Sequence, residues 1–395
     1  MENTAVSHLH PAGSFLVGDH PVPGGREEVW RFTPTAKLVE FFDDTIDRGH
    51  LAIPAAGDGP AGLLGRGHAP RATALTPVDR PAAIAAGVDQ APYLRIEGQV
   101  SQPIRWALRP SGSSEPGGAV RPTADHLVIE ARPGASATVV LNHTGLAHQI
   151  ENVEIIVGAG ATLTVVTIQD WAPGSIHLGQ HEAVVGPDAH FRHVVVSLGG
   201  DIVRLQTNVS YAATGGEAEL YGVYFADAGQ HLEHRLFIDH NQPKGVSQAD
   251  YRGALQGDKA RSVWVGDVLI RPAAQGIQTY ESNKNLILTD GCRADAVPNL
   301  EIETGQIVRA GHSASTGRFD EEQLFYLESR GIDPAEARRL VVRGFFAAIL
   351  ARIGLPDVEA ALLARVDAEL AASAGPADAA SGGASTTPVF PKETR

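Results

Sequence analysis

The stretch from Thr289 to Gly331 decides the fold, and it reads TDGCRADAVPNLEIETGQIVRAGHSASTGRFDEEQLFYLESRG. Its first half predicts two short strands, around 300–302 and 306–308, separated by turn residues. A small-residue segment follows, from 310 to 317, and it carries a lone histidine, His312. The hydrophobic period then changes from two residues to about 3.6. A β region therefore ends here and a helical region begins.

The helix that follows has strong signals at both ends. Asp320 is the expected N-cap and Gln323, three residues later, completes a capping box. Phe319 and Leu324 match a hydrophobic staple, and Gly331 is the expected stop.

Two more helices are predicted downstream. Asp333 is the expected N-cap of the first, which would carry Val341, Phe345 and Ile349 on one face. The second would begin at Pro356, with apolar residues at helical spacing.

Upstream, from about 93 to 309, the sequence has the pattern of a repeating β structure. A Gly-x-x-Ala turn followed by a strand-like run recurs at roughly one coil's spacing, which predicts a solenoid. An antiparallel sandwich with glycine turns is the alternative from pattern alone. The turns begin at Gly134, Gly158, Gly186, Gly215, Gly257 and Gly291.

The N-terminal part shows weaker patterns. Residues 1–24 are rich in Pro, Gly and His and predict a flexible lead-in, in which His20 would be solvated. A short helix is expected over 37–47, and 51–92 reads as irregular structure with short strands. The buried face of the short helix would comprise Leu38, Phe41 and Phe42.

Composition limits the function. The 395 residues are 43% hydrophobic and 20% charged, as in ordinary globular proteins. A net charge of −14 argues against nucleic acid or an anionic membrane as the main partner. We expect a cytoplasmic protein, because there is no apolar spanning run or secretory signal and only one cysteine, Cys292. One cysteine also means that this chain alone cannot hold a cluster through four thiolates.

Four segments carry a family resemblance. NLEIE (299–303), GHSASTG (311–317) and DEEQLFYLESRGI (320–332) resemble the C-terminal signature of the SufB/SufD family, the scaffold subunits of an iron–sulfur cluster assembly machine. REEVWRFTP (26–34) is similar to the N-terminal segment of the SufD branch. The matches span most of the chain in the family's order.

This resemblance implies a mainly β fold: a right-handed parallel β-helix with a small N-terminal α/irregular region and a C-terminal helical module. It implies a non-enzymatic scaffold subunit that pairs with a SufB-like subunit and binds a SufC-type ATPase, with a homodimer also possible. No cofactor would be bound stably by the chain alone, and a transient iron–sulfur cluster would be shared with the partner. The ATPase would dock on the C-terminal helices at Phe325, Tyr326, Val341, Phe345 and Ile349.

Two residues are candidates for cluster assembly. His312 matches a SufD-branch histidine near the SufB-type partner, and its imidazole could bind iron or relay a proton. Many relatives have Cys-Ser-His here, whereas this chain has Ala310-Gly311-His312. Cys292 stands six residues before Pro298, as a cluster-building cysteine does in SufB-like relatives. A packed, incidental thiol is the alternative for Cys292.

The predicted organisation has five parts: a lead-in (1–24), an N-terminal helical/irregular region (25–92), a β-helix core (93–318), a helical module (319–372) and a disordered tail (373–395).

Three other interpretations stay open. A carbohydrate-active β-solenoid enzyme or binding protein would need paired carboxylates, and Glu217, Glu219 and Glu233 show no such spacing. A SufB-like identity would call for more cysteines in the β region.

The histidines of that region complete no recognisable site, so they are expected to be solvated or stacked in ladders: His143, His148, His190, His193, His231, His234 and His240.

Overall fold

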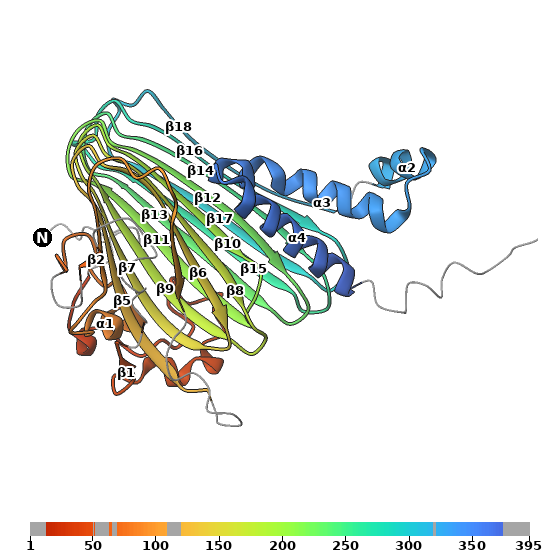
Figure 1. Ribbon diagram of the computed structural model, residues 1–395, viewed down its shortest axis with the longest axis horizontal. Coiled ribbons are helices and arrows are strands. Elements are labelled where there is room, and N and C mark those ends of the chain that lie inside the picture. Colours follow the sequence, from red (N-terminus) through yellow and green to blue (C-terminus); the bar gives the residue numbers. More distant parts are fainter. Residues whose placement is uncertain are drawn as a thin grey trace, which may run out of the picture.

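The structure is a computed structural model that describes residues 13–49, 51, 63–64, 69–108, 120–318 and 321–373. Its centre is a two-sheet parallel β-solenoid (Figure 1), so the predicted fold class is confirmed. The ten-stranded sheet contains β1 (Asp47–Arg48), β2 (Leu63–Leu64), β3 (Tyr93–Ile96), β5 (Pro122–Ala131), β7 (His148–Val157), β9 (Ile176–Val185), β11 (Ile202–Tyr211), β13 (His231–His240), β15 (Arg261–Ile270) and β17 (Arg293–Ile302). The eight-stranded sheet contains β4 (Ile104–Leu108), β6 (Ser136–Gly145), β8 (Thr162–Trp171), β10 (His190–Ser197), β12 (Glu217–Ala226), β14 (Val246–Leu255), β16 (Gln278–Ile287) and β18 (Arg309–Arg318).

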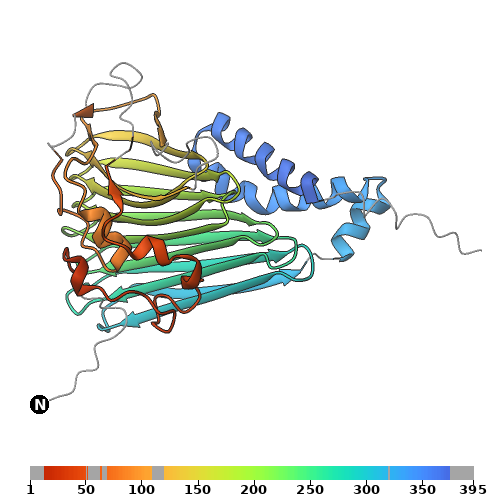
Figure 2. The same cartoon turned by 90° about the horizontal axis from the view of Figure 1, so that it is seen from below.

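From β3 onward, successive strands alternate between the two sheets, and each strand pairs in parallel with the strand two further along the chain. The antiparallel β2–β3 pair is the exception. Figure 2 shows the coils stacked from β5 to β18. The inward-facing side chains of both sheets form one continuous apolar core.

The glycine turns explain both the coil repeat and its irregularity. The first four lie in turns from the ten-stranded to the eight-stranded sheet, and the last two lie in turns that lead the other way. The sequence interval between successive glycine turns is therefore longest between Gly215 and Gly257, where the pattern moves from one kind of turn to the other. At Gly158 a Cβ would lie 2.6 Å from the backbone nitrogen of Pro133 in the preceding turn, so only glycine fits there. The alanines that follow all pack on the inner core: Ala137, Ala161, Ala189, Ala218, Ala260 and Ala294.

The N-terminal part covers the outer face of the ten-stranded sheet (Figure 2). The predicted helix over 37–47 is wrong: the chain forms the short 3₁₀ turns Thr35–Lys37 and Val39–Phe42, then β1. The expected buried face is correct, since Leu38, Phe41 and Phe42 are all buried against this sheet. These three side chains pack on apolar residues of the strands although the segment that carries them is not a regular helix.

One helix in this part was missed. The helix α1 (Arg80–Ala86) lies in the region expected to be irregular, and its alanines gave no apolar period. Asp79 caps it by accepting from the backbone N–H of Ala82 at 3.0 Å.

The described part of the predicted lead-in is held in place. His20 is buried and not solvated, because its Nε2 lies 2.8 Å from the carbonyl oxygen of Ser14. Arg80 donates to the carbonyl oxygens of Val17 and His20 at 3.0 and 3.1 Å. A 3₁₀ turn, Val17–Asp19, lies between these contacts. Residues 1–12 lie outside the described residues.

Three C-terminal helices follow the solenoid, and the second and third of them pack on the outer face of the eight-stranded sheet. The three are α2 (Glu321–Ser329), α3 (Pro334–Leu350) and α4 (Pro356–Ser373), with a 3₁₀ turn at Ala351–Ile353. Asp333 is the N-cap of α3, as predicted, and accepts from the N–H of Ala335 at 2.9 Å. Gly331, beyond α2, adopts a positive φ of 84°. The expected cap Asp320 and the residues after 373 lie outside the described residues.

The end of the β region differs from the sequence prediction. The run 306–308 is not a strand. The last strand, β18, is instead the small-residue segment that follows. Its Gly, Ala and Ser residues have little β propensity, and only pairing with β16 holds them extended.

Five of the seven singled-out histidines are buried, so the solvated alternative is wrong for them: His143, His193, His231, His234 and His240. His240 stacks on Tyr211 with ring centroids 5.1 Å apart, and its Nε2 lies 2.9 Å from the Ser247 hydroxyl. His234 stacks in the same way on Tyr224, at 4.9 Å. Burial lowers the pKa of His234 and of His240 to about 3.

Acid should therefore destabilise the fold through these two rings. The folded rings stay neutral down to a pH of about 3, whereas the unfolded rings bind protons below about 6.5. Stability present above pH 6.5 is lost across this window as pH falls, at about 1.4 kcal/mol per pH unit for each ring. Urea unfolding at pH values from about 7 to 5 should show a shallower pH slope for His240→Gln than for wild type. Ser247→Ala, the control, should lower stability yet keep the wild-type slope. An unchanged slope in His240→Gln would contradict the neutral state of this ring.

Candidate functional site at the open end of the solenoid

The solenoid ends at β17 and β18, the terminal strands of the two sheets. Every residue of β17 and β18 is half-buried or exposed, unlike the largely buried strands of the coils before them. The N–H of Arg309 points toward β16 and donates to the carbonyl oxygen of Ile277, the residue just before that strand, with an N···O distance of 3.3 Å. Since backbone groups alternate along a strand, the N–H groups of Ala310, His312 and Ala314 face the open edge. This edge is therefore a template for another strand.

His312 lies on β18 at this end, with 42% of its side chain exposed. Its strand partner on β16 is Glu281, which is almost fully buried. The Nδ1 of His312 lies 4.0 Å from Oε1 of Glu281. An accessible imidazole thus sits over a carboxyl group that faces the solenoid interior.

The environment of Glu281 favours the neutral acid. Neither of its oxygens has a hydrogen-bond partner within the described part of the chain. Burial, with the charge of Asp267, raises its pKa to about 8. A Cβ at Gly266 would lie 2.3 Å from Oε2 of Glu281, so glycine makes room for the carboxyl group. Glu281 can therefore hold a proton near His312 at neutral pH.

Sequence reasoning missed Glu281. All five residues of the segment ESNKN (281–285) are polar, so nothing in it distinguishes an inward carboxyl group from an outward one. Only the parallel register of β16 with β18 could have identified Glu281 as the partner of His312.

Cys292 lies at a different place. It is half-buried in the turn before β17, with its Sγ 3.3 Å from the carbonyl oxygen of Gly257. Two residues earlier, Asp290 pairs with Arg318 at the far end of β18, at 2.7 Å. Arg318 is six residues from His312 along one strand, about 20 Å. The structure therefore does not bring Cys292 and His312 together.

The expected docking residues fall into two groups. Phe325 and Tyr326 on α2 are 71% and 56% exposed, and α2 extends away from the solenoid (Figure 1). Ile349 is buried against the eight-stranded sheet, so a partner cannot contact it while α3 keeps this position. Val341 and Phe345 are half-buried.

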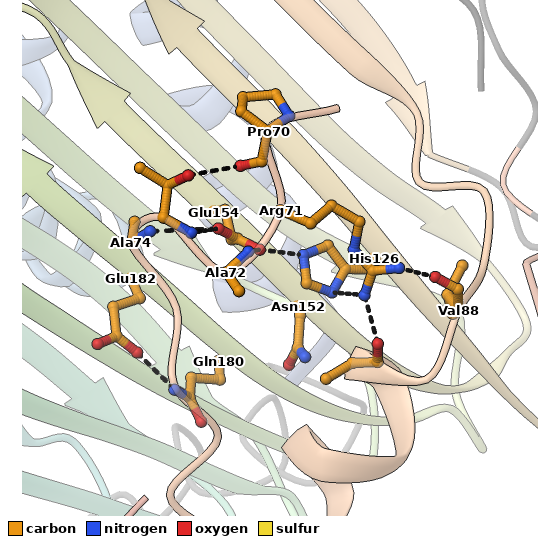
Figure 3. Close-up of polar contacts among 12 residues, drawn as sticks. Pro70, Arg71, Ala72, Ala74, Val88, His126, Asn152, Glu154, Gln180 and Glu182 are labelled. Carbon is orange, nitrogen blue, oxygen red and sulfur yellow. Dashed lines mark hydrogen bonds and ion pairs between the residues drawn. The ribbon is translucent and has the colours of Figure 1, made fainter. Parts of the chain in front are cut away.

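A cluster of polar contacts around Glu154 joins the N-terminal segment to the outer face of the ten-stranded sheet (Figure 3). The Glu154 carboxylate accepts backbone N–H groups of Ala72, Thr73 and Ala74 at 2.9–3.2 Å, and lies 2.8 Å from Nε2 of His126. Arg71 donates to the carbonyl oxygens at the end of α1. These contacts fasten the N-terminal segment to the sheet.

The tryptophan segment is fastened beside it. The Arg204 guanidinium lies 4.0 Å from the centre of the Trp30 ring, and Thr33 donates to Glu233 at 2.8 Å. Glu233 is thus buried on β13, while Glu219 lies on β12 in the other sheet, paired with Arg192. The carbohydrate-active alternative has no paired carboxylates among these residues.

Fold and site together define a two-sheet parallel β-solenoid with an appended helical module and a terminal strand, β18, whose outer edge pairs with no other strand of the described chain. The family model for "SUF system FeS cluster assembly, SufBD core domain" matches residues 114–345. The chain belongs to the SufBD family, and this membership assigns it a role in iron–sulfur cluster assembly.

Several relatives support the assignment. An iron–sulfur cluster assembly SufBD family protein of Mycobacterium leprae is 46% identical over 379 residues, which cover 93% of this chain and 95% of the relative. The iron–sulfur cluster assembly protein SufD of Escherichia coli is 27% identical over 249 residues, covering 62% of this chain and 58% of its own length. SufD of Bacillus subtilis is 26% identical over 251 residues, covering 62% and 56%.

In the described part of the chain, no helix has the length and apolar character needed to span a membrane.

Proposed function

We propose that the chain is a SufD-like, non-catalytic scaffold subunit of a cytoplasmic iron–sulfur cluster assembly complex. It pairs through the open end of its solenoid with a cysteine-bearing SufB-like subunit. The observation that carries this proposal is the terminal strand β18, whose outer edge pairs with no strand among the described residues and which carries the accessible His312. Since this chain has one cysteine, the thiolates of a shared cluster come from the partner.

A SufC-type ATPase docks on the C-terminal helices in this proposal. The exposed aromatic side chains of α2, Phe325 and Tyr326, are the contact residues, since large aromatic residues commonly dominate interface energies. Movement of α2 and α3 driven by the ATPase would be transmitted to the interface along β18, because only residues 319–320 separate β18 from α2.

Pairing along β18 gives a direct test. The N–H of Ala314 faces the open edge, so Ala314→Pro removes a donor there and leaves the bonds to β16 in place. We expect it to weaken binding to the SufB-like subunit at least about tenfold, because a ladder bond is lost and the ring obstructs the edge. Ala314→Thr, the matched control, keeps the N–H and should bind nearly as wild type. Calorimetric titration with the purified subunit measures both, and wild-type affinity of Ala314→Pro would argue against pairing at this edge.

A further inference from the structure

A short segment, residues 71–78, crosses the outer face of the ten-stranded sheet just before α1, and we call it the strap (Figure 3). Side chains of β7 and β9 hold the strap by its backbone. The Glu154 carboxylate accepts three successive N–H groups of the strap. Gln180 donates to the carbonyl oxygen of Thr76 at 3.2 Å, and its Oε1 lies 3.5 Å from the backbone nitrogen of Val78. The position of the strap therefore depends on a few polar side chains of the sheet beneath it.

The closed strap contains a strained residue. Ala72 has a φ of 58°, in the left-handed region that residues with a Cβ rarely adopt. The Glu154 carboxylate offsets this strain, because it accepts the N–H groups of Ala72, Thr73 and Ala74 at 2.9–3.2 Å. Leu75 is fully buried and is an apolar anchor of the strap. Closure is thus a balance in which the charges under the strap take part.

A second carboxyl group lies beside Glu154. Glu182 on β9 pairs in register with Glu154 on β7, and both point to the outer face, because their neighbours Val153 and Ala183 belong to the inner core. Neighbouring strands are about 4.8 Å apart, so the two carboxyl groups share one site. Glu154 is fully buried and Glu182 is half-buried. Two carboxyl groups this close cannot both ionise without a cost.

The surroundings assign the charge to Glu154. Burial alone would raise the pKa of Glu154, but the hydrogen bonds from His126 and from the strap N–H groups outweigh it and lower this pKa. Glu182 receives hydrogen bonds from two neutral amides, Gln180 at 2.7 Å and Asn208 at 3.5 Å. Burial, with a smaller contribution from the Glu154 charge, raises the pKa of Glu182 to about 7. Glu182 therefore holds a proton in mildly acidic solution.

The other titratable groups that face this site lie on β5 and on the strap. His126 on β5 donates from Nε2 to Glu154, because its Nδ1 accepts from Arg71 at 3.3 Å. Burial lowers the pKa of His126 from its usual value of 6.5, so this ring is neutral near pH 7. Asp79, at the end of the strap, pairs with Arg204 of β11 at 3.2 Å. The group of this site whose charge changes around pH 7 is therefore the glutamate of β9.

We propose that the strap is a pH-dependent latch, closed while Glu182 is protonated and loosened when loss of this proton places a second negative charge beside Glu154. In the open state Glu182 is in water and has an ordinary pKa of about 4.3. Opening therefore releases a proton between about pH 4.3 and pH 7, and a rise in pH favours opening across this window. Above this window both states have lost the proton, so the effect levels off. The latch does not depend on pairing at β18.

Hydrogen–deuterium exchange of the full chain tests the latch, with rates corrected for the intrinsic pH dependence of amide exchange. From about pH 6 to about pH 8 the protection of the strap N–H groups should fall about tenfold, because opening releases nearly one proton at the lower pH and almost none at the higher. Peptides from β7 and β9 should keep their protection. Global unfolding has the opposite pH dependence, since the buried rings of His234 and His240 destabilise the fold in acid.

A variant of Glu182 assigns the effect to this residue. Glu182→Gln keeps the size of the side chain and removes its charge, so the strap should be as protected at about pH 8 as the wild-type strap is at about pH 6. The matched control is Glu217→Gln, at an exposed position of β12 in the other sheet, and it should retain the tenfold change. Equal protection of the wild-type strap at both pH values, or a full tenfold change in Glu182→Gln, would overturn the proposal. If Glu182→Gln fails to fold, the wild-type comparison still decides it.

Discussion

Replacing His312 by alanine is expected to reduce cluster maturation in cells at least about tenfold while leaving the fold and the complex intact. The ring is 42% exposed and lies on a terminal strand, so its removal should cost well under about 1 kcal/mol of folding stability. Loss of a metal ligand or of its orienting partner typically costs about 10–100-fold in affinity or activity. The measurement is complementation of a strain that lacks the endogenous copy, scored by the activity of a cluster-dependent enzyme.

Two further variants separate the possible roles of His312. His312→Gln keeps a polar side chain but cannot titrate near neutral pH, so it should fail like alanine if the ring relays protons. Glu281→Gln keeps the size of the inner partner and removes its acid. If His312 works with this acid, Glu281→Gln should also lower maturation, by a smaller factor. Full activity of both His312 variants, in complexes of normal composition, would mean that the ring has no role in assembly.

Substituting both exposed aromatic residues of α2 should abolish capture of the ATPase without lowering the melting temperature. Truncation of an interface aromatic residue of this kind costs about 2 kcal/mol, a factor of roughly 30 in affinity. Phe325→Ser with Tyr326→Ser is therefore expected to bind too weakly for a pull-down. Phe346→Ala should behave in the opposite way: Phe346 is buried against the solenoid, so its loss should destabilise the module by about 3–5 kcal/mol.

The matched control for the α2 variant is Val39→Ser. Val39 is 67% exposed, as apolar as the α2 residues, and lies in the segment that covers the opposite sheet. It should change neither ATPase capture nor stability. Wild-type capture by the α2 double variant, or by a chain that ends at Arg318, would contradict docking on the helical module.

The sequence predicted the solenoid because Gly-x-x-Ala turns recur along the chain and each of the six places an alanine on the inner core. It also predicted α3, because the N-cap Asp333 is a signal contained in the few residues around the start of the helix. It failed at β18, where small residues are extended only because β16 pairs with them. Which face of α3 packs inward was also hidden, because the sheet that buries Ile349 is formed by distant strands.

The site was predictable only in part. His312 could be singled out from its small-residue neighbours and from the family resemblance. Glu281 could not, because its position beside His312 comes from the parallel register of β16 with β18 and from alternation that places it inside. In a solenoid whose outer faces are also covered, inward and outward positions have similar hydrophobicity, so alternation is not visible in the sequence.

We propose above that strand β18 forms the interface with a SufB-like subunit. Site-specific photo-cross-linking tests it most directly, with the reactive group placed at the exposed Ser315 of β18 in the full complex in its own cells. The same group at Arg338, exposed on α3, serves as the comparison. We expect Ser315 to cross-link to the cysteine-bearing homologue and Arg338 not to do so. A Ser315 cross-link to a second copy of this chain, to the ATPase, or to no protein at all would contradict it.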